Sequence, residues 1–270
     1  MREKIQVEEY DNIVELYNSG LSKGKIEKLY GVSNSVIDRI FKIKGVTCRD
    51  NSHKGRKYTL NENYFDNIDT PKKAYILGLL YADGTNYTPN RLIKIELQER
   101  DKDILEEINK ELGSNRELYF NDLSSKNSNH QNTYGLIIVN KHMSEILKQK
   151  GMMQNKSLVL KFPEWLDEDL YSHFIRGYFD GDGHIEWSRT KFINLASTRE
   201  FCEFIKEYMF CKFNISSSIY DTSNKDFNTK VLHIFKKSQI KLFLDWLYKD
   251  AELYIQRKYN SYQQICNEMT

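Results

Sequence analysis

ILGLLYADG at residues 76–84 and IRGYFDGDG at residues 175–183 are two versions of one short pattern. Each begins as an apolar run with helical character and ends in an acid followed by a glycine. A pattern that returns at this distance indicates two copies of a unit of about 100 residues, each too small to bury a large core alone. We therefore expect the two copies to pack against each other.

Small residues stand four positions apart in both copies, as Gly78, Ala82, Gly177 and Gly181. Small residues at this spacing let two helix backbones approach closely and cross. If the two strips meet, the copies are related by a pseudo-twofold axis. Asp83 and Asp182 would then lie side by side where the helices end.

That placement is electrostatically poor for Asp83 and Asp182. An anion at the C-terminal end of a helix is disfavoured by about 0.3–1 kcal/mol, and two adjacent carboxylates repel each other further. Divalent cations would offset both effects, and oxygen ligands suit Mg²⁺. Paired metal ions that clamp the attacking and leaving oxygens are a common device for phosphodiester hydrolysis. A single Asp-Gly would only mark a helix end, but two matching copies favour a metal site.

Composition limits the class of protein. Hydrophobic residues make up 40% and charged residues 29% of the 270, as in soluble globular proteins of one or two domains. No segment has the length of a membrane span, and the first residues, MREKIQVEEYDN, lack a signal-peptide core. The cysteines are scattered, which argues against disulfides and zinc and favours a reducing cytosol.

Residues 10–44 have the pattern of three short helices, with Ser22 and Ser33 as candidate N-caps and glycines in the turns. The stretch resembles the helix-turn-helix modules of resolvases and transposases, so we expect a DNA-binding module over residues 1–45. The resemblance implies that the third helix enters a major groove. Its candidate DNA-binding residues are Asn34, Ser35, Arg39 and Lys42. A helical subdomain that binds nothing is the alternative.

A basic linker is expected at residues 46–71, where periodicity is lost and Asn, Ser, Lys and Asp dominate. Arg56 and Lys57 are its candidate DNA contacts. A merely solvated linker would have the same composition.

The remaining sequence forms two units, residues 72–165 and 166–270, each ordered as helix, strands, helix, strands, helix. This order predicts an α+β fold with mostly antiparallel sheets. In residues 93–98 apolar and polar side chains alternate, which predicts a strand with one face free of core contacts. The polar residues expected on the free faces of the two sheets are Lys94, Glu96, Gln98, Asn194 and Ser197.

Both nine-residue segments resemble the LAGLIDADG motif of the homing endonucleases, and the chain is similar to the single-chain members with two repeats over residues 72–270. The resemblance implies two pseudo-twofold-related units with saddle-shaped antiparallel sheets. It also implies that Asp83 and Asp182 bind metal, assisted by the backbone carbonyls of Ala82 and Gly181. The sixth motif residue is Tyr81 in one copy and Asp180 in the other, away from the metal-binding position.

The same resemblance implies polar and basic residues around the metal. Gln98 stands where a family glutamine is often found, and Ser197 is its looser counterpart. Lys156 and Lys258 match the lysine expected near the end of each repeat, and Lys161 is a rival for the first of them.

The chain therefore resembles a Mg²⁺-dependent, site-specific double-strand DNA endonuclease. We expect a monomer that binds a long DNA site, with no membrane association and a cytoplasmic location, as a bacterial or phage-encoded protein that associates with the nucleoid when bound. Two alternatives remain on the same fold: a DNA-binding regulator that has lost cleavage, and an RNA-binding maturase.

Overall fold

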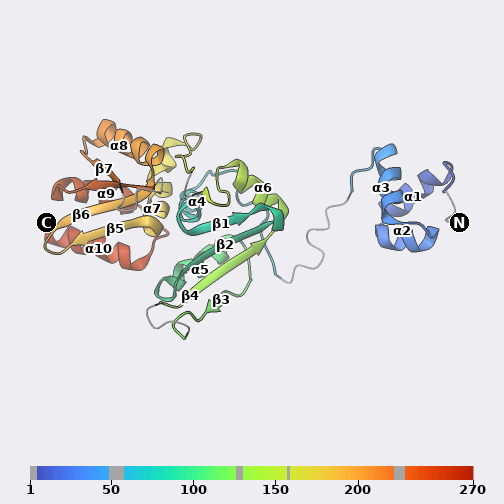
Figure 1. Ribbon diagram of the computed structural model, residues 1–270, viewed down its shortest axis with the longest axis horizontal. Coiled ribbons are helices and arrows are strands. Elements are labelled where there is room, and N and C mark those ends of the chain that lie inside the picture. The colour runs from blue at the N-terminus through green and yellow to red at the C-terminus, as the bar shows by residue number, and fades with distance from the viewer. Residues whose placement is uncertain (1–4, 49–57, 126–129, 157–158, 222–228, 270) are drawn as a thin grey trace. The chain divides into compact units, whose positions relative to one another are not determined.

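The computed structural model describes residues 5–48, 58–125, 130–156, 159–221 and 229–269. The chain forms two compact units, Met1–Gly55 and Arg56–Thr270 (Figure 1). Each unit has its own hydrophobic core. No helix in the described ranges is long and apolar enough to cross a membrane.

The first unit contains three helices within residues 5–48: α1 (Glu9–Asn18), α2 (Lys23–Tyr30) and α3 (Asn34–Ile43). The Ser22 hydroxyl accepts a hydrogen bond from the Lys25 amide at 3.3 Å, so it caps α2 as predicted. Ser33 occupies the N-cap position of α3, but its hydroxyl bonds to Ser35 instead. The expected three-helix arrangement is therefore present.

The second unit begins with α4 (Pro71–Asp83), β1 (Gly84–Tyr87), β2 (Leu92–Gln98), α5 (Lys102–Glu111), β3 (Tyr119–Asn121), β4 (Thr133–Val139) and α6 (Lys141–Gln149). It continues with α7 (Tyr171–Asp182), β5 (Gly183–Trp187), β6 (Lys191–Thr198), α8 (Arg199–Phe213), β7 (Ser218–Asp221), β8 (Thr229–Ile234), α9 (Lys237–Tyr248) and α10 (Gln256–Glu268).

The strands form two antiparallel four-stranded sheets with the same strand order, β1-β2-β4-β3 and β5-β6-β8-β7 (Figure 1). Helices cover one face of each sheet. In β2, Ile93, Ile95 and Leu97 are buried while the residues between them are half-buried, which confirms the predicted alternation. The mixed helix–sheet fold with two antiparallel sheets is confirmed.

The first strand of each sheet was not expected from the sequence. β1 and β5 begin at Gly84 and Gly183, directly after the motif aspartates, because the chain passes from helix to strand without a loop. β1 is four residues long and contains Asn86, a residue type common in turns. Asn86 is fully buried instead, and its amide donates to the carbonyls of Ser144 and Met152.

Helices α4 and α7 pack along each other and join the two halves into one core (Figure 1). A Cβ atom on Gly78 would lie 2.0 Å from the Phe174 carbonyl oxygen, and one on Gly177 would lie 2.0 Å from that of Tyr75. The backbones are therefore closer than any side chain allows at these positions. This is the helix crossing that the small residues predicted.

Part of the predicted linker belongs to the folded second unit. Tyr64 and Phe65 are buried in its core, and the Thr59 hydroxyl donates to the Gly113 carbonyl at 2.8 Å. The expected linker 46–71 is thus too long at its C-terminal end, because aromatic residues without periodicity still bury their rings.

A network centred on Glu96 links three strands of the first sheet. Its carboxylate accepts hydrogen bonds from Thr133 in β4 at 2.6 Å and Asn121 in β3 at 3.0 Å, and it pairs with Lys94 at 2.5 Å. Partial burial raises the pKa of Glu96, but the Lys94, Thr133 and Asn121 bonds outweigh it and lower the pKa to about 2. The ionised form of Glu96 therefore stabilises the fold.

Replacing Gly177 by alanine should destabilise the second unit by about 3 kcal/mol, because the added methyl group meets backbone that cannot move aside. Thermal unfolding by circular dichroism and fluorescence measures this, and the tryptophans Trp165, Trp187 and Trp246 all report on the second unit. Gly24→Ala is the control, since nothing lies within 4 Å of its added Cβ. Equal stability of the two variants would contradict the close crossing.

Replacing Glu96 by glutamine should lower stability on the order of 2 kcal/mol at pH 7. The folded-state pKa of about 2 lies below the ordinary 4.5, so the contribution is complete above pH 4.5 and is lost as pH falls through 2. Urea unfolding of both proteins at several pH values should show them converging near pH 2. If the difference in free energy of unfolding between the unmodified protein and Glu96→Gln stays constant with pH, the ionised Glu96 carboxylate is not the source of the stability.

Candidate functional site

The two motif aspartates meet where α4 and α7 end. A Cβ atom on Gly181 would lie 2.4 Å from Ala82 Cβ and 2.6 Å from Asp83 Oδ2, so the Asp83 carboxylate lies against the opposite helix just before Asp182. Glycine at position 181 is what leaves room for this carboxylate. The paired acids predicted from the repeats are thus brought together.

Solvent reaches both side chains, yet the surrounding protein raises their pKa values. Loss of hydration raises the pKa of Asp83 to about 6, and the charge of Asp182 adds to this. Burial also raises the pKa of Asp182, while the nearby Tyr178 hydroxyl opposes this shift. The site therefore concentrates negative charge that the fold itself only partly neutralises.

Lys156 and Lys258 lie buried beside these acids in matching positions. Lys156 Nζ donates to the carbonyls of Ala82 at 3.1 Å and Gly84 at 2.5 Å. Lys258 Nζ donates to Phe179 at 2.5 Å and to the carbonyl of Gly183. Each ammonium group thus caps the C-terminal carbonyls of a motif helix, where a cation is favoured.

Burial lowers the pKa of both lysines, to about 8 for Lys258, while Asp83 and Asp182 oppose this shift. Lys161, the rival candidate, pairs with Glu200 on the surface at 3.0 Å. Lys156 is therefore the first-repeat lysine that lies beside the acids.

The sixth motif position anchors each lysine-bearing segment. The Tyr81 hydroxyl donates to the Lys150 carbonyl, shortly before Lys156. Asp180 is fully buried and accepts from the Ile255 amide at 2.7 Å, shortly before Lys258. The two residues differ in chemistry but hold corresponding parts of the chain, a role that the sequence did not indicate.

Gln98 lies at the end of β2, half-buried, and its Oε1 is buried without a hydrogen-bond partner among the described residues. The outward orientation and the counterpart role expected of Ser197 are wrong. Ser197 is 6% exposed and bonds to the Tyr178 hydroxyl at 2.9 Å. Because Gly84 pairs with Ile95 and Gly183 with Leu195, the register counterpart of Gln98 is Thr198.

The free faces of the two sheets differ in chemistry. The first carries the Lys94–Glu96 network described above. On the second, Asn194 bonds to His233 at 2.7 Å, and aromatic rings surround this pair. These rings belong to Phe192, Tyr220 and Phe235, and the last two are about half exposed. The aromatic character of this face was not predicted.

The predicted DNA-binding residues of the first unit are exposed on α3. Asn34 bonds to Glu27 at 3.1 Å and Ser35 to Ser33 at 2.8 Å. Arg39 and Lys42 have no hydrogen-bond or ion-pair partner among the described residues. Arg56 and Lys57 lie outside the described residues.

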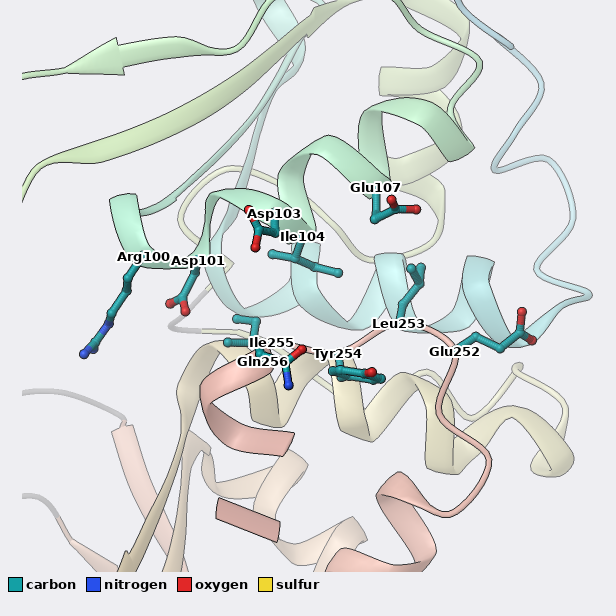
Figure 2. Close-up of a pocket in the computed structure, with 10 residues that line it drawn as sticks. All are labelled: Arg100, Asp101, Asp103, Ile104, Glu107, Glu252, Leu253, Tyr254, Ile255 and Gln256. Atoms are coloured by element: carbon teal, nitrogen blue, oxygen red, sulfur yellow. The ribbon is translucent and has the colours of Figure 1, made fainter. Parts of the chain in front are cut away.

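A tether between the two halves positions the start of α10. Asp101 is 4% exposed at its side chain, and its two oxygens accept from Arg257 Nε at 3.0 and 3.1 Å. Asp101 also lines a cavity of about 200 Å³ between α5 and the 252–256 segment (Figure 2). Arg257 precedes Lys258, so the tether helps to hold that lysine in place.

The residues at the helix ends fit a divalent cation. Within the described ranges no three His, Cys, Asp or Glu side chains converge, so a cation would be held by the Asp83 and Asp182 carboxylates with carbonyls and water. Such a set suits Mg²⁺, which retains several waters and binds through one or two carboxylates. The Ala82 carbonyl, expected as a ligand, already accepts from Lys156.

Comparison with known proteins identifies part of the chain. Residues 169–247 match a family model described as a LAGLIDADG-like domain. This region begins just before α7 and ends within α9, so it contains the second motif helix and the second sheet.

Two curated relatives come from Methanocaldococcus jannaschii. Glutamine--fructose-6-phosphate aminotransferase is 26% identical over 92% of this chain and 23% of its own length. Probable translation initiation factor IF-2 is 27% identical over 49% of this chain and 13% of its own length. The chain thus spans about a quarter or less of the curated relatives it matches.

Solved structures to which the chain is similar include full-length DUF199/WhiA from Thermatoga maritima, with 17% identity and a TM-score of 0.47 over 77% of this chain and 65% of that one. The I-LtrWI LAGLIDADG homing endonuclease bound to target DNA has 13% identity and a TM-score of 0.48 over 77% and 91%. Similarity at this level assigns neither an activity nor a partner. Residues 169–247 thus resemble a LAGLIDADG-like domain, in a chain whose two halves repeat the same order of helix and sheet.

Proposed function

We propose that this protein is a site-specific double-strand DNA endonuclease that requires Mg²⁺. The observation that carries the proposal is the meeting of Asp83 and Asp182 at the glycine-mediated helix crossing, with a buried lysine beside each helix end. Adjacent carboxylates that reach solvent at the negative ends of two helices have no structural benefit. They are useful when they hold a cation that acts on a phosphodiester.

The chain's residues have separate roles in this proposal. Bound Mg²⁺ supplies Lewis acidity toward the phosphate and lowers the pKa of water. Asp83 and Asp182 hold the cation. Lys156 and Lys258 place positive charge near the phosphate while they fix the carbonyls after each helix. Each half contributes one acid and one lysine to this shared site, and these two related sets of residues account for cleavage of two strands.

The first unit extends the DNA contact in this proposal. Arg39 and Lys42 project from the exposed side of α3 without partners among the described residues, which suits contacts to bases and phosphates in a major groove. Contacts from this unit and from both sheets produce a long recognition site.

The alignments with the two curated relatives support the proposal that this chain has an activity of its own, different from those for which the relatives are named. The alignments cover 92% and 49% of this chain, so they overlap, yet the two relatives are named for different activities. A module present in both provides neither named activity. An endonuclease that promotes insertion of its own gene accounts for such a distribution.

A regulator that binds DNA without cutting it is the second candidate. Lys156 favours this candidate, because its ammonium group already donates to the Ala82 carbonyl. Together with Lys258, it also balances part of the negative charge of the two acids without a metal cation. Retention of both acids favours the endonuclease.

Replacing Asp83 or Asp182 by asparagine should reduce double-strand cleavage at least about 100-fold, because each change removes an ionised ligand. The substrate is an uninterrupted duplex that joins the two sequences flanking the gene, incubated with Mg²⁺. Asp169→Asn, at the opposite end of α7, is the control and should cut normally. DNA affinity without Mg²⁺ should change little.

Two outcomes would count against the endonuclease. If the unmodified protein leaves this duplex intact while binding it, the regulator is the better assignment. If either Asp variant cuts both strands at the normal rate, the acids do not hold the cation.

Deleting residues 1–45 should weaken DNA binding while leaving cleavage at high protein concentration. The double variant Arg39→Ala/Lys42→Ala should weaken binding about tenfold, since two phosphate or base contacts are lost. Lys25→Ala/Lys28→Ala on α2 makes the same charge change and is the control. Mobility-shift titrations measure all four proteins, and equal affinities would reduce the first unit to a structural role.

A further inference from the structure

We propose that a basic cavity beside the second motif binds a single phosphate group of the DNA backbone. The cavity has a volume of about 240 Å³ and is lined by Arg100, Gly183, His184, Ile185, Arg257, Lys258 and Ser261. No acidic side chain is among these residues. The inference rests on the proposed function in that the phosphate belongs to DNA.

Arg100 supplies the free charge of the cavity. It lies in the short 3₁₀ turn Glu99–Asp101 of the first half and is exposed. Its side chain extends away from Asp103 and Glu107 (Figure 2). Among the described residues no hydrogen bond or ion pair engages its guanidinium group. A planar guanidinium group with five donors is well suited to bind phosphate in a bidentate manner.

The opposite wall adds further donors from the second half. Asp101 bonds only to Nε of Arg257, so the terminal nitrogens of Arg257 remain without a partner among the described residues. The Ser261 hydroxyl, one turn later on α10, donates to the Arg257 carbonyl at 3.1 Å and would turn from it to donate to a phosphate. His184 is exposed on β5. Donors from both halves therefore converge on one space.

The position of the cavity relates it to the candidate acids. Gly183 and Lys258 line it, and Gly183 directly follows Asp182. A phosphate bound here would lie next to the second motif. It would place the DNA backbone along the end of α7.

Among the described residues, the first half does not have cationic side chains at the positions that match His184 and Arg257. Thr85 pairs with Lys94 in the first sheet, and His184 pairs with Asn194 in the second, so Thr85 corresponds to His184. Asn155 precedes Lys156 as Arg257 precedes Lys258. Neither Thr85 nor Asn155 carries a cationic side chain, so we assign this phosphate contact to the second half alone.

The test uses the full chain, with inorganic phosphate as the first probe. Titration followed by ³¹P NMR at low ionic strength should show binding that Arg100→Gln weakens about tenfold, as loss of a charged hydrogen-bonding group implies. Arg189→Gln, an exposed arginine outside the cavity, is the control and should bind phosphate normally. Arg257 is left unchanged because it also holds Asp101. Ser261→Ala, a second variant, should weaken binding to a smaller extent.

A duplex of arbitrary sequence is the second probe. In fluorescence anisotropy across salt concentrations, Arg100→Gln should lower the slope of log affinity against log salt by about one. Absence of phosphate binding to the unmodified protein, or equal affinity in all variants, would overturn the proposal even if the protein cuts DNA. If the protein binds phosphate in a manner that depends on Arg100 but cuts no duplex, the phosphate-binding cavity is supported and the proposed endonuclease activity is refuted.

Discussion

The close crossing of α4 and α7 is the constraint on which the rest of the second unit depends. Gly78 and Gly177 each leave room for a carbonyl oxygen of the other helix, at a separation that no Cβ atom permits. Since both motif sequences continue directly into strands, the crossing also fixes where the sheets begin. It therefore sets the distance between the halves and places both acids at one point.

The crossing creates an electrostatic problem that other segments reduce. Two carboxylates and the carbonyl ends of two helices lie together, and buried lysines from the ends of both repeats donate to those carbonyls. Tyr81 and Asp180 tie the lysine-bearing segments to the motif helices. The second half uses a carboxylate for this because its partner is a backbone N–H that donates to Asp180, whereas in the first half the Tyr81 hydroxyl donates to a backbone carbonyl.

The two halves keep the same topology but have diverged in surface chemistry. The first sheet has a charged network around Glu96, while the second exposes aromatic rings around His233. The basic cavity with Arg100 lies beside the second motif. Under the proposed function, each sheet face contacts a different half-site of one DNA, and this divergence gives each face its own chemistry.

Local periodicity in the sequence was sufficient to predict the repeats, the helix crossing, the alternation of β2 and the two acids. Each of these depends on residues close together in the chain. The tertiary structure alone decided that Lys156 rather than Lys161 reaches the helix end, and that Ser197 faces the core. A shift of one residue in strand register moves a side chain to the other face of the sheet, and the β5–β6 pairing sets that register. Arg100 likewise meets α10 through contacts between segments far apart in the chain, and local sequence patterns do not predict such contacts.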